Sequence, residues 1–212
     1  MKKMKLTALA LAVALGLAAC GAKPAEKGLM GGGAASSAAD VQTSGAASAA
    51  DSASVPESPI PLGEFTAESL TGDTIDQTVF AGHKLTVINV WATFCGPCKQ
   101  EMPVLGKLAE ELKDDVQVLG IVTDVVDQSG NPDEGQVQLA KDLVAASDVG
   151  YQNLILNESL AQLGFAGLQA VPATLFVDGD GNLVGKGFYG ALEEDDWRQV
   201  IDERLALAEE AA

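Results

Sequence analysis

Trp91-Ala92-Thr93-Phe94-Cys95-Gly96-Pro97-Cys98-Lys99 marks the point at which a predicted strand gives way to a predicted helix. Cys95 and Cys98 lie three positions apart, a spacing at which two thiols can form a reversible disulfide. At the start of a helix, free backbone N–H groups and the helix dipole favour the thiolate, which is the form that attacks disulfides. The run therefore predicts a redox-active dithiol, in which Cys95 is more exposed with a lowered pKa and Cys98 is more buried.

A purely structural role for Cys95 and Cys98, as a stabilising disulfide or as part of a zinc site, is not favoured by the sequence. The chain has three cysteines, too few for a small domain held together by disulfides. A bridge within so short a loop adds little stability. A zinc site needs four ligands, and the predicted domain offers only His83 besides the two cysteines as imidazole or thiolate ligands. We therefore expect no metal, and no cofactor other than the redox-active disulfide Cys95–Cys98.

The first twenty residues indicate export. A basic start at residues 1–5 precedes an uncharged apolar stretch at 6–19, which is short for a membrane span and typical of a signal peptide. The segment Leu17-Ala18-Ala19-Cys20-Gly21 resembles the bacterial lipobox, which implies cleavage before Cys20 and lipidation of its thiol. An ordinary signal peptide with an incidental cysteine is the alternative. We expect an extracytoplasmic, membrane-anchored lipoprotein of the bacterial cell envelope.

Charge and composition divide the rest of the chain. The formal net charge of −17 argues against nucleic-acid binding and against attraction to anionic lipids, so a lipid must supply membrane attachment. Residues 20–60 are rich in Ala, Gly and Ser and almost lack large apolar residues, which predicts a flexible tether. Residues 61–212 are of a size that suits one domain with one core.

Hydrophobic periodicity predicts an α/β domain. We expect a hairpin at 65–75, strands at 85–91, 117–123 and 151–156, helices at 98–113, 136–147 and 158–164, a second hairpin formed by 174–177 and 183–188 across a turn at 178–182, and a closing helix at 193–208. This order of elements predicts a central mixed β-sheet flanked by helices, with an N-terminal β-hairpin.

Four features together resemble the thioredoxin superfamily, and specifically its TlpA/ResA/CcmG-type membrane-anchored thiol-disulfide oxidoreductases. The resemblance covers about 60–205. Its features are the run Trp91–Cys98, Pro103 five residues after Cys98, the segment Val171-Pro172-Ala173-Thr174, which is similar to the family's cis-proline segment, and an insertion at about 124–165. The resemblance implies a thioredoxin-like fold and thiol-disulfide exchange.

The resemblance also suggests roles for the residues around the thiols. Cys95 would attack a client disulfide, and Cys98 would resolve the mixed disulfide. Gly96 and Pro97 would shape the turn and favour a reducing protein. Pro172 would lie against the disulfide and offer the Val171 backbone to an extended client segment; an ordinary trans proline that opens a strand is the alternative.

Three polar or aromatic residues near the thiols leave their roles open. Glu101, three residues after Cys98, either shuttles a proton to and from Cys98 or merely complements the start of the helix. Asn89 stands where thioredoxin has a buried aspartate, and because an amide cannot take a proton, that duty would fall to Glu101 or to water. Trp91 either forms a substrate-facing platform beside the thiols or packs in the core.

The leading functional hypothesis is an extracytoplasmic protein disulfide reductase. The resemblance implies recharging by a membrane electron donor of the CcdA/DsbD type, and clients such as apocytochrome c, as in cytochrome c assembly, or a methionine sulfoxide reductase. A disulfide-introducing oxidase and a non-enzymatic surface-binding lipoprotein are alternatives. A thiol peroxidase of the same fold is a third, although Ile88 and Ala92 occupy the positions at which the peroxidase signature has Pro and Thr.

Overall fold

The predicted buried strand at 85–91 is the middle strand of a five-stranded mixed sheet. In the computed structural model, which describes residues 60–211, β3 (Leu85–Trp91) pairs in parallel with β4 (Val116–Val122) and antiparallel with β6 (Ala173–Asp178). At the edges, β5 (Asn153–Ile155) lies parallel to β4, and β7 (Phe188–Tyr189) lies antiparallel to β6. The strand order β5-β4-β3-β6-β7 confirms the predicted central mixed sheet.

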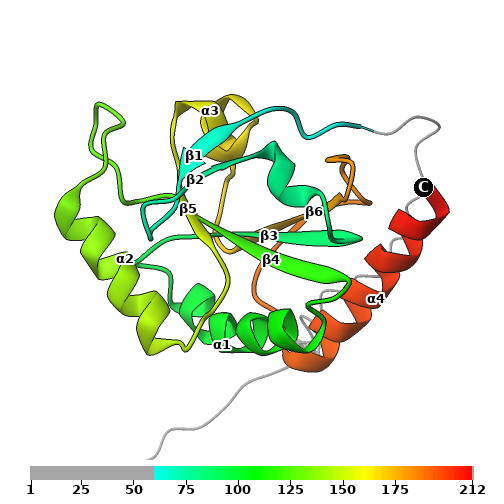
Figure 1. The fold of residues 1–212 in the computed structure, drawn as a ribbon. Coiled ribbons are helices and arrows are strands. Elements are labelled where there is room, and N and C mark those ends of the chain that lie inside the picture. Colours follow the sequence, from blue (N-terminus) through cyan, green and yellow to red (C-terminus); the bar gives the residue numbers. More distant parts are fainter. Residues whose placement is uncertain (1–59, 212) are drawn as a thin grey trace, which may run out of the picture. The chain divides into compact units, whose positions relative to one another are not determined.

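Elements on both faces of the sheet give the domain three layers (Figure 1). One face carries the helices α1 (Gly96–Glu111) and α4 (Glu194–Ala211). The other face carries the N-terminal hairpin and several short helices, which are β1 (Thr66–Glu68), β2 (Thr74–Asp76), η1 (Gln77–Phe80), α3 (Glu158–Gln162) and η2 (Phe165–Gly167). The predicted N-terminal hairpin is confirmed, with β1 and β2 antiparallel.

The region predicted as an insertion extends the sheet and one of its flanks. It contains α2 (Glu134–Ala146), then β5 and α3. The apolar side of α2 packs against a cluster that includes Trp91 and both cysteines of the motif. This region therefore forms one wall of the surroundings of the disulfide.

One predicted strand is wrong. The turn after β6 forms as expected, and Val184 N–H donates to Phe176 O over 2.9 Å, but the strand predicted at 183–188 is interrupted, and regular pairing resumes only at β7. Gly185 has a φ of +63°, which takes the chain out of extended conformation. A Cβ at Gly187 would overlap Thr174 O, so this approach of the two segments requires glycine.

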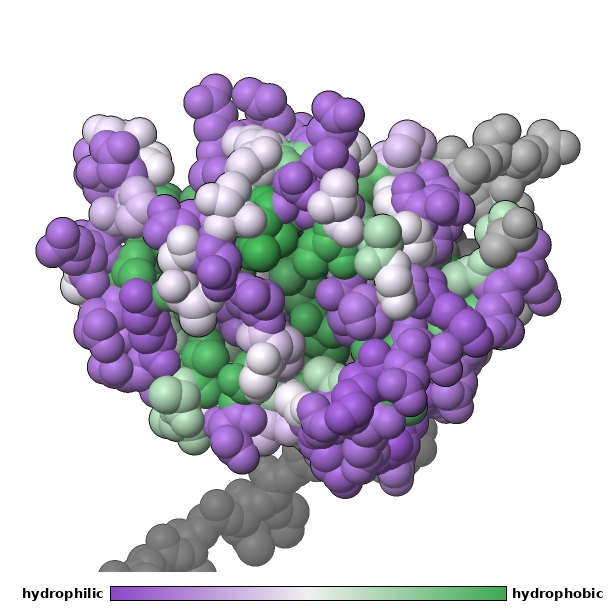
Figure 2. All heavy atoms as spheres, viewed as in Figure 1, coloured by the Kyte–Doolittle hydropathy of each residue, from purple (hydrophilic) through white to green (hydrophobic). Residues whose placement is uncertain are grey.

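The surface of α4 is strongly hydrophilic. Figure 2 shows hydrophilic side chains over α4, while hydrophobic side chains come into view mainly between the elements. Three of the acidic residues lie in the first turn of the helix, Glu194, Asp195 and Asp196, where they complement the positive end of the helix dipole.

The N-terminal segments lie outside the described residues. The predicted signal peptide at 1–19, the lipidation site Cys20 and almost all of the predicted tether at 20–60 belong to this part of the chain. Within residues 60–211, no helix combines the length and apolar character needed to cross a membrane.

Candidate active site

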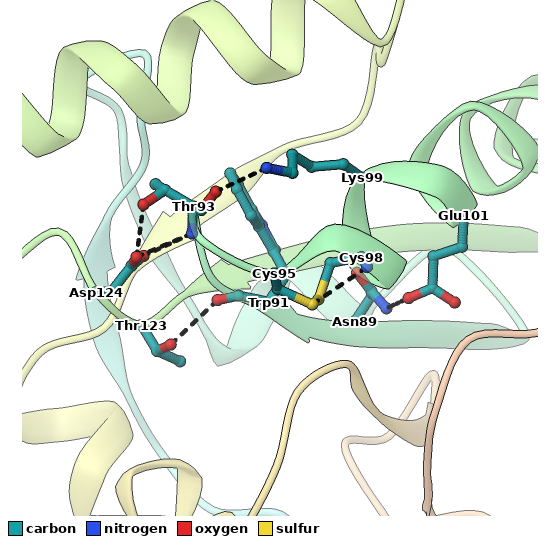
Figure 3. The surroundings of a disulfide bond; sticks show 9 residues. All are labelled: Asn89, Trp91, Thr93, Cys95, Cys98, Lys99, Glu101, Thr123 and Asp124. Carbon is teal, nitrogen blue, oxygen red and sulfur yellow. Dashed lines mark hydrogen bonds between the residues drawn. A yellow bond between two sulfur atoms is a disulfide. The ribbon is translucent and has the colours of Figure 1, made fainter. Parts of the chain in front are cut away.

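The two cysteines of the motif form a disulfide at the N-terminus of α1 (Figure 3). Cys95 is the N-cap residue of this helix, and its Sγ accepts a hydrogen bond of 3.2 Å from Cys98 N–H. Pro97 lies in the first turn, where a missing N–H costs nothing, and Pro103 lies farther along the helix. This placement lets backbone N–H groups stabilise a thiolate on Cys95 when the pair is reduced.

Cys95 is slightly more exposed than Cys98, as the sequence predicted. Cys95 is 5% exposed and Cys98 is fully buried, whereas Gly96 and Pro97 lie at the surface. Phe94, immediately before Cys95, is 75% exposed, which is unusual for so large an apolar side chain. An incoming client sulfur would therefore reach Cys95 before Cys98.

The Val171–Pro172 segment packs against the group of buried residues that includes both cysteines. The peptide bond between these residues is cis, as the resemblance led us to expect. Val171 is half-buried and packs against the apolar cluster that contains both cysteines. Gly190 N–H donates to Pro172 O over 2.9 Å, which ties the segment to the end of β7. Two sequence segments more than seventy residues apart thus meet at one site.

Glu101 is a buried carboxyl one helical turn after Cys98. It is 2% exposed, and its Oε1 accepts a hydrogen bond of 2.9 Å from Asn89 Nδ2. Burial raises the pKa of Glu101 to about 7, while the hydrogen bond from Asn89 acts in the opposite direction. A carboxyl with this pKa can take up and release a proton near neutral pH.

Trp91 does not face the substrate side of the disulfide, so the predicted platform role is corrected. Its side chain is fully buried, and its indole N–H donates to Asn153 Oδ1 over 2.9 Å. Gly120 lies between these two partners, and a Cβ at this position would overlap Asn153 Oδ1. Trp91 therefore supports the site from within the core, which was the other role open to it.

Several residues at the site were not selected from the sequence. Thr93 and Asp124 bond to each other beside the disulfide, and Asn153 holds Trp91. Phe94 and Tyr189 are two of the four exposed large hydrophobic residues among residues 60–211. Phe94 had a signal, because an apolar residue before the first motif cysteine stands next to an exposed turn. The other four had none, because their contacts join distant strands.

The described residues offer no obvious metal site. Between residues 60 and 211, no group of three or more His, Cys, Asp or Glu side chains is arranged to hold an ion. The Cys95–Cys98 disulfide is the redox group that the site itself supplies.

Comparisons with known proteins agree with this geometry. Residues 56–201 match the model of the family named Redoxin. The chain is 32% identical over 154 residues to the thiol:disulfide interchange protein DsbE of Pseudomonas fluorescens biotype C, with 71% of this chain and 78% of that protein covered. It is 27% identical over 144 residues to the thiol-disulfide oxidoreductase ResA of Halalkalibacterium halodurans, with 68% and 72% covered.

Among solved structures, a similar fold is found in the pneumococcal exposed lipoprotein thioredoxin Etrx1 of Streptococcus pneumoniae strain TIGR4. It matches with a TM-score of 0.51 and 26% identity, over 66% of this chain and 99% of that one.

Proposed function

Because the chain belongs to the Redoxin family and is a thiol-disulfide oxidoreductase of the thioredoxin fold, we propose that it reduces disulfide bonds of client proteins outside the cytoplasm. One observation carries the proposal. Cys95 Sγ sits against the Cys98 N–H at the start of α1, and the Val171–Pro172 segment packs against the group of buried residues that includes both cysteines. This arrangement joins an activated thiol to a backbone that can hold an extended client chain.

The reaction begins with the reduced dithiol. The Cys95 thiolate attacks one sulfur of a client disulfide, a mixed disulfide forms, and the other client sulfur leaves as a thiolate. The Cys98 thiolate then attacks Cys95 Sγ, which releases the second client thiolate and forms the Cys95–Cys98 disulfide. Two electrons pass from the protein to the client, and the client thiolates take up protons.

Glu101 is proposed to accept the proton that Cys98 loses in the second step. Its carboxyl lies on the same helix one turn away and has a pKa raised to about 7 by burial, so it is part-ionised at neutral pH. Asn89, which bonds to this carboxyl, holds it in place but cannot take a proton itself.

The client is proposed to bind across the exposed side of the disulfide. Its backbone would pair with Val171, and its side chains would contact Gly96, Pro97 and Phe94 at the motif and Tyr189 at the edge of the sheet. Ala173 is the β-ladder partner of Tyr189, so this exposed aromatic lies next to Pro172. Contacts of this kind hold a polypeptide without reading its full sequence.

The proposed location follows from the first twenty residues and from the relatives. The lipobox-like end at Cys20 supports export and lipidation, and the similar Etrx1 is described as an exposed lipoprotein. A reductase in an oxidising compartment needs a continuous supply of electrons, so we include a membrane electron donor of the CcdA/DsbD type. Apocytochrome c and a methionine sulfoxide reductase are the proposed clients.

The test is a trapping experiment with the full-length protein in its native membranes. Cys98→Ser removes the resolving thiol, so mixed disulfides through Cys95 are expected to accumulate and to disappear on treatment with dithiothreitol. The matched control is the double variant Cys95→Ser, Cys98→Ser, which keeps Cys20 but has no attacking thiol. Adducts seen equally with both variants, or with neither, would contradict the proposal. Mass spectrometry of the adducts names the clients.

A further inference from the structure

The loop before Cys95 is fastened to the end of the neighbouring strand. Asp124, two residues beyond β4, accepts three hydrogen bonds from Thr93, two of 2.9 Å from its N–H and one of 2.6 Å from its hydroxyl (Figure 3). Thr123 adds a second attachment, because its N–H and hydroxyl both donate to Trp91 O, at 3.0 and 3.1 Å. The segment that follows β3 is thus hydrogen-bonded to the segment that follows β4.

The fastened loop leads directly to the attacking sulfur. Cys95 N–H donates to Ala92 O over 3.0 Å, which closes a turn around Thr93. Lys99 reaches back from α1, and its Nζ donates to Thr93 O over 3.3 Å. Thr93 is therefore bound on one side by Asp124 and on the other by the helix that Cys95 caps. Displacement of Thr93 would displace Cys95 Sγ from the Cys98 N–H.

We propose that Asp124 is a positioning residue for Cys95: through Thr93 it holds the Ala92–Cys95 turn so that the Cys95 sulfur stays aligned with the start of α1. The inference rests on the proposed role of Cys95 as the attacking thiol. Asp124 suits the task because a carboxylate can accept bonds from a backbone N–H and a hydroxyl at once, and bonds to a charged acceptor are stronger than neutral ones.

The positioning role and a plain charge effect predict opposite changes in the pKa of the Cys95 thiol when Asp124 is replaced. A negative charge near a thiol disfavours the thiolate, so removing the Asp124 charge alone would lower the pKa of the Cys95 thiol. Loss of the hydrogen bonds would let the sulfur drift from the helix N-terminus and would raise that pKa toward its ordinary value. The sign of the change therefore identifies the mechanism.

The experiment measures the pKa of the Cys95 thiol in the reduced full-length protein. Alkylation by iodoacetamide is followed as a function of pH on the Cys95-containing peptide by mass spectrometry, which separates it from Cys20. Asp124→Ala is expected to slow alkylation at pH 6 by about tenfold, which corresponds to a rise of about one pKa unit. Asp124→Asn keeps an acceptor oxygen and is expected to slow it by less than about threefold.

Thr93 and a distant carboxylate complete the set of variants. Thr93→Val removes the hydroxyl bond alone and is expected to slow alkylation by about two- to threefold, whereas Thr93→Ser restores the wild-type rate. Asp202→Asn removes the same charge from the surface of α4 and should change nothing. If Asp124→Ala does not fold, the Thr93 pair alone decides the question.

Two results would overturn the inference. One is an alkylation profile of Asp124→Ala or Thr93→Val that matches that of Asp202→Asn. The other is an equal lowering of the thiol pKa by Asp124→Ala and Asp124→Asn, which would assign the effect to charge. The measurement uses no client, so it stands whether or not mixed disulfides are trapped with Cys98→Ser.

Discussion

The two faces of the central sheet bury their polar side chains in different places. Toward β1, β2 and α3, the strands present Ile88, Val90, Leu119 and Ile121, which pack with aromatic and aliphatic residues of those elements. The one polar residue that β3 buries on this face, Thr86, lies near the start of the strand and accepts a hydrogen bond from Gln117.

Toward α1 and α4, the first half of β3 presents the apolar residues Leu85 and Val87. Its second half buries Asn89, whose cross-strand partner Thr174 is also buried. The buried carboxyl of Glu101 accepts a hydrogen bond from Asn89.

The position of these polar groups shows what each face contributes. Burying a carboxyl and an amide costs free energy that an apolar side chain of similar size would not cost. Asn89, Thr174 and Glu101 lie where β3 runs into the motif loop, whereas Arg204 of α4, also buried on this face, lies over the Phe176 ring. We infer that the first face mainly stabilises the fold, whereas the end of the second face prepares the dithiol for reaction.

The largest expected effect on stability comes from the apolar face. Ile121→Ala is expected to lower the free energy of unfolding by about 2–5 kcal/mol, because the side chain is buried in a close-packed cluster. Urea unfolding measures this change. The rate of insulin disulfide reduction per folded molecule should stay unchanged. A large loss of that rate would contradict the inference that the first face mainly stabilises the fold.

Glu101→Gln tests the polar end of the other face through the pH dependence of stability. The folded pKa of about 7 lies above the ordinary value of 4.5, so the contribution of Glu101 to stability is largest below pH 4.5 and is lost as the pH rises to about 7. The variant lacks this loss. At pH 8 it should exceed the wild type by on the order of 3 kcal/mol in the free energy of unfolding, with little difference at pH 4.

The same substitution should slow the resolving step. In single-turnover reduction of a client, loss of the proton acceptor is expected to lower the rate of release by about tenfold or more. Glu110→Gln is the matched control, because Glu110 is exposed on the same helix and pairs only with Lys113 across the surface. Equal stability curves for Glu101→Gln and the wild type from pH 4 to pH 8 would contradict the buried, part-ionised carboxyl.

Local rules predicted the dithiol site well. The N-cap position of Cys95, the helix after it and the buried strand before it follow from residue type and periodicity within about fifteen residues. Val171–Pro172 was found through its resemblance to a family motif. The interrupted strand before β7 was missed because Gly185 and Gly187 were treated as ordinary strand residues.

The supporting contacts of the site could not be predicted in the same way. The bond between Trp91 and Asn153 joins residues 62 positions apart, and that between Thr93 and Asp124 joins residues 31 positions apart. Which side chains meet depends on the register of β3, β4 and β5, which the hydrophobic pattern fixes only when the partners are known. For the same reason, the sequence left open whether Trp91 faced the client or the core.

The reduction potential of the Cys95–Cys98 couple tests the central claim, that this protein gives electrons to client disulfides. Equilibration of the full-length protein against glutathione redox buffers measures it, with the reduced and oxidised forms separated after alkylation. We predict a reducing value, below about −200 mV and close to the roughly −270 mV of thioredoxin. A value near the roughly −120 mV of strong oxidants would contradict it and would assign the dithiol to disulfide formation.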